Sequence, residues 1–213
     1  MKKVFAIVLI VCLAMTAVFA DKGDFKVGAQ AGYGTLALSI KKDSNNYITS
    51  NNGGFYFAGA AEYYFSDAFA GKVEFGLNTM GKAKSSGAIA GISTSGTASE
   101  ASPVQFSTYF GLQYNIEVSK DLDLGLGAGW DMMIGKESSD DDAKTNAAMG
   151  VGFEVVVAYK MNKSTALTFG SKLGILFINS DDDIDDVYAT FADNDCKVSQ
   201  TAFKFFVGVT FAL

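Results

Sequence analysis

Apolar residues recur at every second position in several segments of this chain. In segment 122–134, apolar side chains at even positions alternate with glycine and aspartate at odd positions as far as Asp131. A period of two predicts β-strands, because successive side chains of a strand point to opposite faces. Eight such segments are expected, at residues 25–33, 55–65, 71–79, 103–116, 122–134, 149–161, 165–177 and 201–213.

The first segment has the weakest pattern. Its apolar residues fall on odd positions up to Tyr33, whereas Leu36, Leu38 and Ile40 fall on even positions. A β-bulge near Gly34 and Thr35 would reconcile the two phases, because a bulge adds one residue to a strand. The alternative is that the strand ends at Gly34.

One face of the predicted strands is large and apolar, and the other is small or charged. Each segment is about as long as the roughly 9–11 residues that a tilted strand needs to cross a bilayer. In a soluble barrel the bulky face would fill the interior, so we expect the bulky face here to meet lipid. The last strand runs to residue 213, and pairing with the first strand would keep that end ordered. The pattern therefore predicts an all-β fold, a transmembrane eight-stranded antiparallel up-and-down β-barrel.

The expected connections alternate between short and long. Residues 66–68, 117–121 and 162–164 form tight turns, whereas 41–54, 80–102, 135–148 and 178–200 are long and polar. Short turns on one side and long loops on the other are typical of outer-membrane barrels, with the short turns in the periplasm. The second loop is rich in glycine, alanine, serine and threonine, and we expect it to be exposed and mobile.

The first 20 residues have the pattern of a secretion signal. Two lysines precede an apolar run that is too short to span a membrane, and small or compact residues end at Ala20. We therefore expect residues 1–20 to be a cleaved signal peptide and 21–213 to be the barrel domain. Lipidation at Cys12 is disfavoured, because Val11 stands where a small residue is needed. A secreted soluble barrel is the alternative that needs no membrane.

Aromatic residues gather near the ends of the predicted strands. Such positions suit the two rings of aromatic side chains that border the membrane around a barrel, although strands favour aromatic residues in general. The expected ring near the short turns contains Tyr63, Phe65, Tyr114 and Tyr159, and the ring at the other rim contains Phe55, Phe106, Trp130 and Phe177.

The inner face is predicted to carry balanced charges. It holds five lysines and five acids, and a narrow lumen makes an unpaired charge costly. Symmetric closure of the short turns would place Glu62 opposite Lys72 and Glu154 opposite Lys172. Such a lumen is either plugged by ion pairs or forms a narrow gated path. The inward charged residues are Lys26, Lys72, Lys160, Lys172, Lys204, Glu62, Glu74, Asp123, Asp131 and Glu154.

The overall composition excludes several classes of function. The net charge is −6, every basic residue is a lysine, and nucleic-acid binding is therefore not expected. The chain has no histidine, so a histidine-dependent hydrolase is excluded and we expect no enzymatic activity. We expect no cofactor. Cys196 is the only cysteine after the leader, and its thiol is either free or in an intermolecular bond.

A dense acidic run lies in the fourth long loop. Asp181, Asp183 and Asp185 have the spacing of a calcium loop, but Asp186 and Ala192 occupy positions where glycine and glutamate are required. An EF-hand is therefore excluded. The default interpretation is a solvated surface loop, and weak calcium binding is the alternative.

The chain resembles the small eight-stranded outer-membrane barrels of the OmpA, OmpX and OmpW kind. The tail is similar to the assembly signal of such proteins, with Gly208, Phe211 and Leu213 at the expected spacing, although phenylalanine usually ends the signal. The resemblance implies contact with outer-membrane lipid and a transient partnership with the barrel-assembly machinery. We expect a structural, adhesive or surface-interaction role through the long extracellular loops, with a surface ligand as a further candidate partner. A narrow channel for ions or small solutes, hydrophobic ones included, is the alternative, and the sequence leaves the oligomeric state open.

Overall fold

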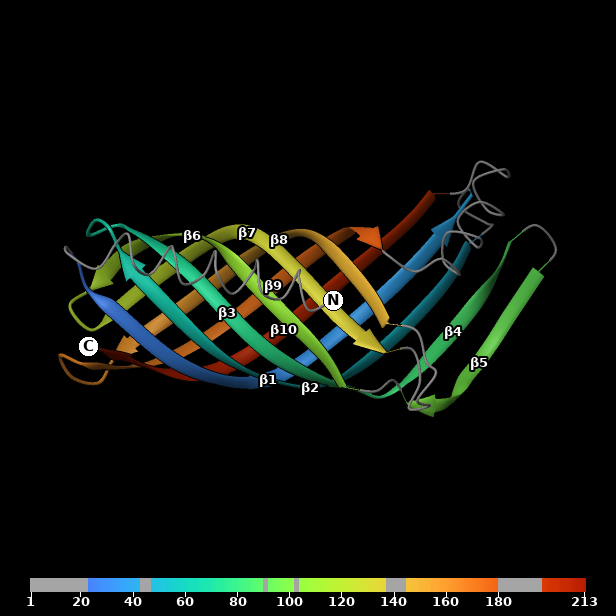
Figure 1. Ribbon diagram of the computed structural model, residues 1–213, viewed down its shortest axis with the longest axis horizontal. Coiled ribbons are helices and arrows are strands. Elements are labelled where there is room, and N and C mark those ends of the chain that lie inside the picture. The colour runs from blue at the N-terminus through green and yellow to red at the C-terminus, as the bar shows by residue number, and fades with distance from the viewer. Residues whose placement is uncertain (1–22, 43–46, 90–91, 102–103, 137–144, 180–196) are drawn as a thin grey trace.

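The computed structural model describes residues 23–42, 47–89, 92–101, 104–136, 145–179 and 197–213 (Figure 1). None of these residues belongs to a helix long and apolar enough to cross a membrane. The described chain consists of ten strands joined by short turns and by the segments between the described ranges. The strands are β1 (Phe25–Lys41), β2 (Tyr47–Tyr64), β3 (Phe69–Met80), β4 (Lys82–Ile89), β5 (Ile92–Ala101), β6 (Val104–Ser119), β7 (Leu122–Lys136), β8 (Thr145–Lys160), β9 (Thr165–Asn179) and β10 (Lys197–Ala212).

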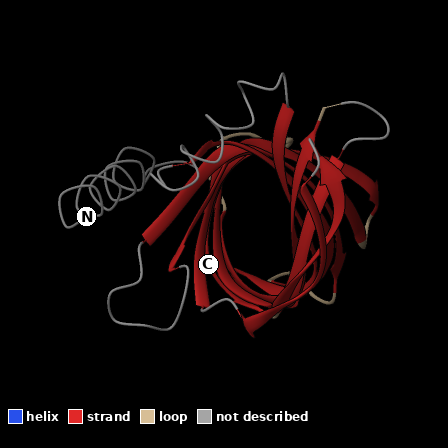
Figure 2. Ribbon diagram, turned by 90° about the vertical axis from the view of Figure 1, so that its right-hand side faces the viewer, coloured by secondary structure: helices blue, strands red, loops and turns tan. Residues whose placement is uncertain are grey.

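Eight of the strands form a closed antiparallel barrel. Its order is β1, β2, β3, β6, β7, β8, β9 and β10, and pairing of β1 with both β2 and β10 closes the ring (Figure 2). The predicted all-β barrel and its eight strands are therefore confirmed. The end with the tight turns at residues 65–68, 120–121 and 161–164 is named the short-turn end, and the opposite end is named the long-loop end.

The prediction for the first strand was wrong in both of its forms. β1 neither bulges nor ends at Gly34, because its pairing with β2 and β10 continues without a register shift to Lys41. The change of apolar phase has another cause. The odd positions face outward throughout, so Leu36, Leu38 and Ile40 point into the lumen, where Ile40 is buried.

The second loop contains a hairpin that the sequence did not predict. Residues Lys84 to Ala88 of β4 pair with Asn51 to Tyr47 of β2, and β5 pairs with β4. Within the described ranges, β5 has no second neighbour, so one of its edges is unpaired. The hairpin extends beyond the barrel wall at the long-loop end (Figure 1). Its exposure is as predicted, since every second side chain from Lys82 to Ala88 is exposed.

The outer surface of the barrel is apolar, and large side chains fill much of its interior. Outward side chains such as Phe57, Leu112, Phe153 and Val207 are about half exposed. The inward glycines leave room for large side chains, because a β-carbon at Gly170 would lie 2.4 Å from Phe206 Cζ. Much of the interior is therefore filled by side chains, and these include aromatic residues that the alternation pattern did not single out.

Candidate functional site

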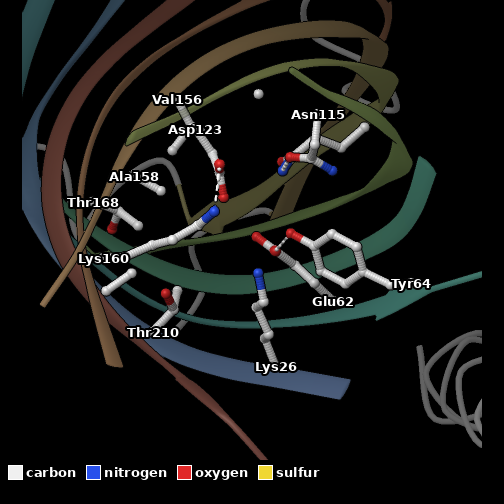
Figure 3. Close-up of a pocket in the computed structure, with 13 residues that line it drawn as sticks. Lys26, Glu62, Tyr64, Asn115, Asp123, Val156, Ala158, Lys160, Thr168 and Thr210 are labelled. Atoms are coloured by element: carbon white, nitrogen blue, oxygen red, sulfur yellow. Dashed lines mark hydrogen bonds and ion pairs between the residues drawn. The ribbon is translucent and has the colours of Figure 1, made fainter. Parts of the chain in front are cut away.

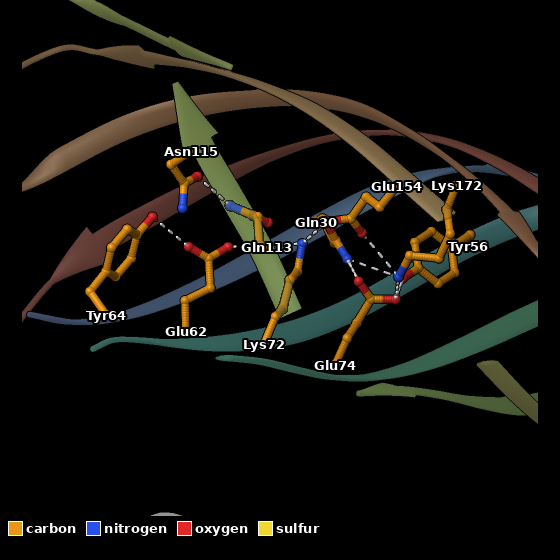
Figure 4. Close-up of polar contacts among 10 residues, drawn as sticks. All are labelled: Gln30, Tyr56, Glu62, Tyr64, Lys72, Glu74, Gln113, Asn115, Glu154 and Lys172. Atoms are coloured by element: carbon orange, nitrogen blue, oxygen red, sulfur yellow. Dashed lines mark hydrogen bonds and ion pairs between the residues drawn. The ribbon is translucent and has the colours of Figure 1, made fainter. Parts of the chain in front are cut away.

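Four charged side chains form an ion-pair network across the middle of the lumen. Lys72 of β3 donates a hydrogen bond to Glu154 of β8, on a strand that is not its neighbour in the sheet. Lys172 of β9 lies 2.6 Å from Glu74 Oε1 and 3.1 Å from Glu154 Oε2 (Figure 4). All four side chains are at most 4% exposed. The network therefore links β3, β8 and β9 through the interior, in addition to the bonds of the barrel wall.

The structure brings together both pairs of charges that strand parity predicts. Glu62 lies opposite Lys72 in the register of β2 and β3, and Lys72 Nζ is 3.8 Å from Glu62 Oε1. Glu154 lies opposite Lys172 in the register of β8 and β9. The contacts of Lys72 with Glu154 and of Lys172 with Glu74 are shorter, and they cross the lumen. Strand parity relates only neighbouring strands, so these contacts across the lumen could not be predicted from it.

Aromatic and amide side chains complete the network. Tyr56 donates its hydroxyl hydrogen to Glu74, and Gln30 donates to the same carboxylate. Lys172 Nζ lies 4.1 Å from the centre of the Tyr109 ring, a cation–π geometry. Tyr56 is fully buried and Tyr109 is 1% exposed. The alternation pattern did not predict Tyr56 and Tyr109 as parts of this network. Each is a single large residue on an inner face whose other residues are mostly small or charged.

Removal of the Tyr56 hydroxyl should measure how much this network stabilises the barrel. The Tyr56→Phe variant keeps the ring but withdraws one hydrogen bond from the buried carboxylate of Glu74. We expect a loss of about 1–3 kcal/mol in the free energy of unfolding, the cost of an unsatisfied buried polar group. Denaturant unfolding of the refolded protein in lipid vesicles checks this value. A matched Tyr159→Phe change on the outer surface should be nearly neutral, and equal losses in both variants would contradict the prediction.

A looser pair lies on the long-loop side of this network. Lys204 Nζ is 3.8 Å from Asp131 Oδ1 and 5.0 Å from the centre of the Tyr56 ring. Neither group makes a hydrogen bond to a described residue, and the same holds for the amide of Asn78 and the hydroxyl of Ser107. All four side chains are at most 3% exposed. This layer of the lumen is polar and buried, and ordered water is the usual partner for such groups.

An apolar cluster, named the collar, lies in the lumen above this polar layer. Several collar residues lie two positions nearer the long-loop end than a residue of the polar layer on the same strand. Met80 follows Asn78 and Met133 follows Asp131, whereas Ala202 precedes Lys204 because β10 runs in the opposite direction. These residues pack together near the long-loop end. The collar accounts for the phase change of β1, because its Leu36 packs against the cluster. The collar consists of Leu36, Met80, Met133, Ala148, Leu176 and Ala202.

The short-turn end of the lumen contains a small polar cavity of about 40 Å³ (Figure 3). Lys160 Nζ lies 2.8 Å from Asp123 Oδ1 at its wall, and Lys26 Nζ lies 4.2 Å from the centre of the Tyr64 ring. A second, smaller cavity continues inward as far as Lys72 and Phe206. The lumen is therefore hollow at the short-turn end and filled from Lys72 onward.

The structure places most of the predicted aromatic residues on the outer surface. Phe65 packs against Phe69, which in turn packs against Tyr114, with ring centres 6.2 and 4.9 Å apart. Tyr63 is partly buried. Phe177 lies in β9, but its side chain is outside the described part of the structure. The outward exposed members of the two predicted rings are Phe55, Phe65, Phe106, Tyr114, Trp130 and Tyr159.

The predicted assembly signal lies in β10 and at the end of the chain. Gly208 faces the lumen beside Gln30, Phe211 is exposed on the outer surface, and the amide of Leu213 donates a 2.9 Å hydrogen bond to the carbonyl of Phe25. The acidic run with Asp181, Asp183 and Asp185 lies outside the described residues, as does Cys196. No group of metal-binding side chains occurs among the described residues.

These features define a class of protein: a small closed β-barrel with an apolar outer surface and a charged, filled interior. The family model of the outer membrane protein beta-barrel domain matches residues 5–211. The chain belongs to this family, and membership implies a location in the bacterial outer membrane. No curated protein sequence gives a significant match.

Solved structures of small outer-membrane barrels share this fold. Neisserial surface protein A (NspA) has 14% identity and a TM-score of 0.56, over 89% of this chain and 99% of that chain. The outer membrane protein OprG from Pseudomonas aeruginosa has 13% identity and a TM-score of 0.54, over 90% and 96%. The N-terminal barrel domain of OprF from Pseudomonas aeruginosa has 9% identity and a TM-score of 0.50, over 90% and 100%. At these identities the likeness concerns the fold alone.

Proposed function

We propose that this protein is a closed barrel that acts through its surface at the long-loop end, in a structural or adhesive role. The observation that carries this proposal is the filled lumen, in which the central charged and aromatic side chains are almost completely buried. The role is non-enzymatic in this proposal; the chain has no histidine, which excludes a histidine-dependent hydrolase.

Two barriers in series support the closed state. The ion-pair network of Lys72, Glu74, Glu154 and Lys172 occupies the middle of the lumen, and the apolar collar lies between it and the long-loop end. An ion would have to displace paired charges at the first barrier and enter a dry constriction at the second. Hydrophobic constrictions oppose conduction by excluding water. A wide permanent pore is therefore not expected, and eight-stranded barrels are in general filled by side chains.

The sheet above the collar supports a role at the surface. β10, β1, β2, β4 and β5 continue there as one sheet, in which Ile40 pairs with Ile48 and Ile48 pairs with Gly87. The unpaired edge of β5 offers backbone donors and acceptors, and exposed edges of this kind can bind an extended segment of a partner. A barrel that served only as a membrane anchor would not need this extension.

A narrow gated path is a second candidate function. The observation that favours it is the pair of cavities that lead from the short-turn end to Lys72. Beyond Lys72, the polar layer with unpartnered atoms on Asn78, Ser107 and Asp131 could hold water. Conduction by this route requires both the network and the collar to open.

We also propose how the protein is exported, assembled and placed in the outer membrane. Residues 1–20 direct export and are removed, and the short-turn end faces the periplasm. The exposed apolar wall contacts outer-membrane lipid, with aromatic side chains such as Phe55 and Tyr159 at its borders. The terminal segment with Gly208, Phe211 and Leu213 engages the barrel-assembly machinery. The surface at the long-loop end contacts a ligand, and nucleic acid is not a partner.

Replacement of the hairpin tests the surface role. Substituting a two-residue Asn-Gly turn for residues 82–101 should leave the barrel intact, because β3 and β6, which this segment connects, still pair up to Thr79 and Val104. We expect normal heat-dependent migration on a gel. We also expect the variant to lose adhesion. Bacteria that display it should adhere to mucin-coated plates, and to layers of the same bacteria, no better than cells without the protein.

A variant with the short turn 162–164 replaced by the same Asn-Gly sequence is the matched control, since that turn lies at the opposite end of the barrel. Adhesion that is unchanged by removal of the hairpin, or equally reduced in the control, would contradict a role for this sheet.

A further inference from the structure

The polar cavity at the short-turn end has features of a binding site that the closed-lumen proposal does not use. Its wall is formed by side chains from β1, β2, β6, β7, β8, β9 and β10. The labelled side chains of Figure 3 include both ammonium groups and both carboxylates of this cavity, together with the amide of Asn115. A ligand here would enter from the short-turn end and stop at the floor near Lys72 and Phe206.

Two amide side chains of β6 each leave one polar atom without a partner. Gln113 Nε2 donates a 2.7 Å hydrogen bond to Asn115 Oδ1, and Gly125 leaves the space for this contact. Gln113 Oε1 and Asn115 Nδ2 are both buried, and neither has a hydrogen-bond partner among the described residues. Gln113 is only 4% exposed. A buried amide left in this state is costly, so the cavity requires a partner that both donates and accepts hydrogen bonds.

The charges of the cavity have the same mixed character. Lys160 and Asp123 neutralise each other at 2.8 Å. Lys26 rests on the ring of Tyr64 and makes no ion pair with a described carboxylate. Glu62 accepts a 3.1 Å hydrogen bond from the Tyr64 hydroxyl and lies 3.8 Å from Lys72. The ammonium group of Lys26 and the carboxylate of Glu62 therefore remain able to contact a ligand. These two residues lie opposite each other in the register of β1 and β2.

We propose that this cavity binds a small zwitterion of the amino-acid type. The carboxylate of the ligand accepts hydrogen bonds from Lys26 Nζ and Asn115 Nδ2. Its ammonium group donates to Glu62 and to Gln113 Oε1. An anion alone would leave Gln113 Oε1 without a donor and would face Glu62, and a cation alone would leave Asn115 Nδ2 without an acceptor and would face Lys26. A ligand with both charges satisfies all four groups.

The first experiment uses glycine as the probe. Titration of glycine into the refolded, isotopically labelled barrel in micelles should give saturable NMR shifts of the Gln113 and Asn115 side-chain amides. Acetate and methylammonium, which each carry one half of the ligand, should bind at least about tenfold more weakly, a loss of about 1.4 kcal/mol. Equal, non-saturating shifts with all three probes would overturn the proposal and would mean that the cavity holds water only.

Two variants locate the binding. Lys26→Met and Asn115→Leu should each weaken glycine binding at least about tenfold, again about 1.4 kcal/mol, whereas Lys163→Met in the exposed turn should leave it unchanged. Heat-dependent migration on a gel verifies that each variant is folded. Glycine affinity that is equal in wild type and both cavity variants would overturn the proposal. The result is separate from the closed-lumen proposal, because the cavity lies outside both barriers and can bind a ligand whether or not the lumen conducts.

Discussion

Replacing Lys172 with methionine is expected to destabilise the barrel by about 3–5 kcal/mol, the cost of breaking a buried ion pair by removing one partner. Lys172 is the residue that holds Glu74 and Glu154 together, at 2.6 and 3.1 Å, and its side chain is fully buried. Methionine fills a similar volume but leaves two carboxylates with one lysine fewer. Denaturant unfolding in lipid vesicles, followed by the fluorescence of Trp130, measures the loss.

Two further variants separate charge from volume. Lys172→Met combined with Glu74→Gln removes one charge of each sign and should recover a large part of the lost stability. Lys163→Met removes an exposed lysine from a turn and should change the free energy of unfolding by less than about 0.5 kcal/mol. If the single variant at Lys172 loses no more than this control, the network does not stabilise the barrel.

Opening the lumen is expected to require changes at both barriers. The wild-type protein should show no current steps in a planar bilayer. A collar variant, Leu36→Ala with Met133→Ala and Leu176→Ala, should also give no current steps, because the ion-pair network still blocks the middle of the lumen. A network variant, Lys72→Ala with Glu154→Ala, should give no current steps, because the apolar collar still excludes water from the lumen.

The combination of the two variants should give stable current steps. Each protein is first shown to be folded by its heat-dependent migration on a gel, because the network variant loses stability. Steps from the wild-type protein would favour the narrow gated path over the closed barrel. Silence of the folded combined variant would mean that a third barrier exists in the lumen.

The barrel itself could be predicted because its information is local. Alternation within each segment gives the strand and its outward face, and the short turns fix the register between neighbours, which places Glu62 opposite Lys72. Contacts across the lumen depend on the diameter and tilt of the closed barrel. The hydrogen bond from Lys72 to Glu154 and the cation–π contact of Lys172 with Tyr109 therefore could not be derived from strand parity.

The course of β1 and the hairpin of β4 and β5 could not be predicted, for two different physical reasons. An outward apolar face was assumed along the full length of every strand, but above the level of Tyr33 β1 lines the collar and its apolar residues turn inward. The residues of β4 and β5 are small and polar, so they carry no alternation signal. Their hairpin depends on main-chain pairing with β2, which amino-acid patterns reveal poorly.

Closure of the ring between β1 and β10 has a consequence for the time course of biogenesis. β1 pairs with β2, which follows it in the chain, but Lys26 also pairs with Ala212, so the second edge of β1 stays unpaired until β10 is available. Contacts of such high contact order form slowly. Until they form, the apolar surfaces that later meet lipid are open to water, where an unfolded chain aggregates. The interval before β1 and β10 pair is therefore the one in which this chain is most prone to aggregation.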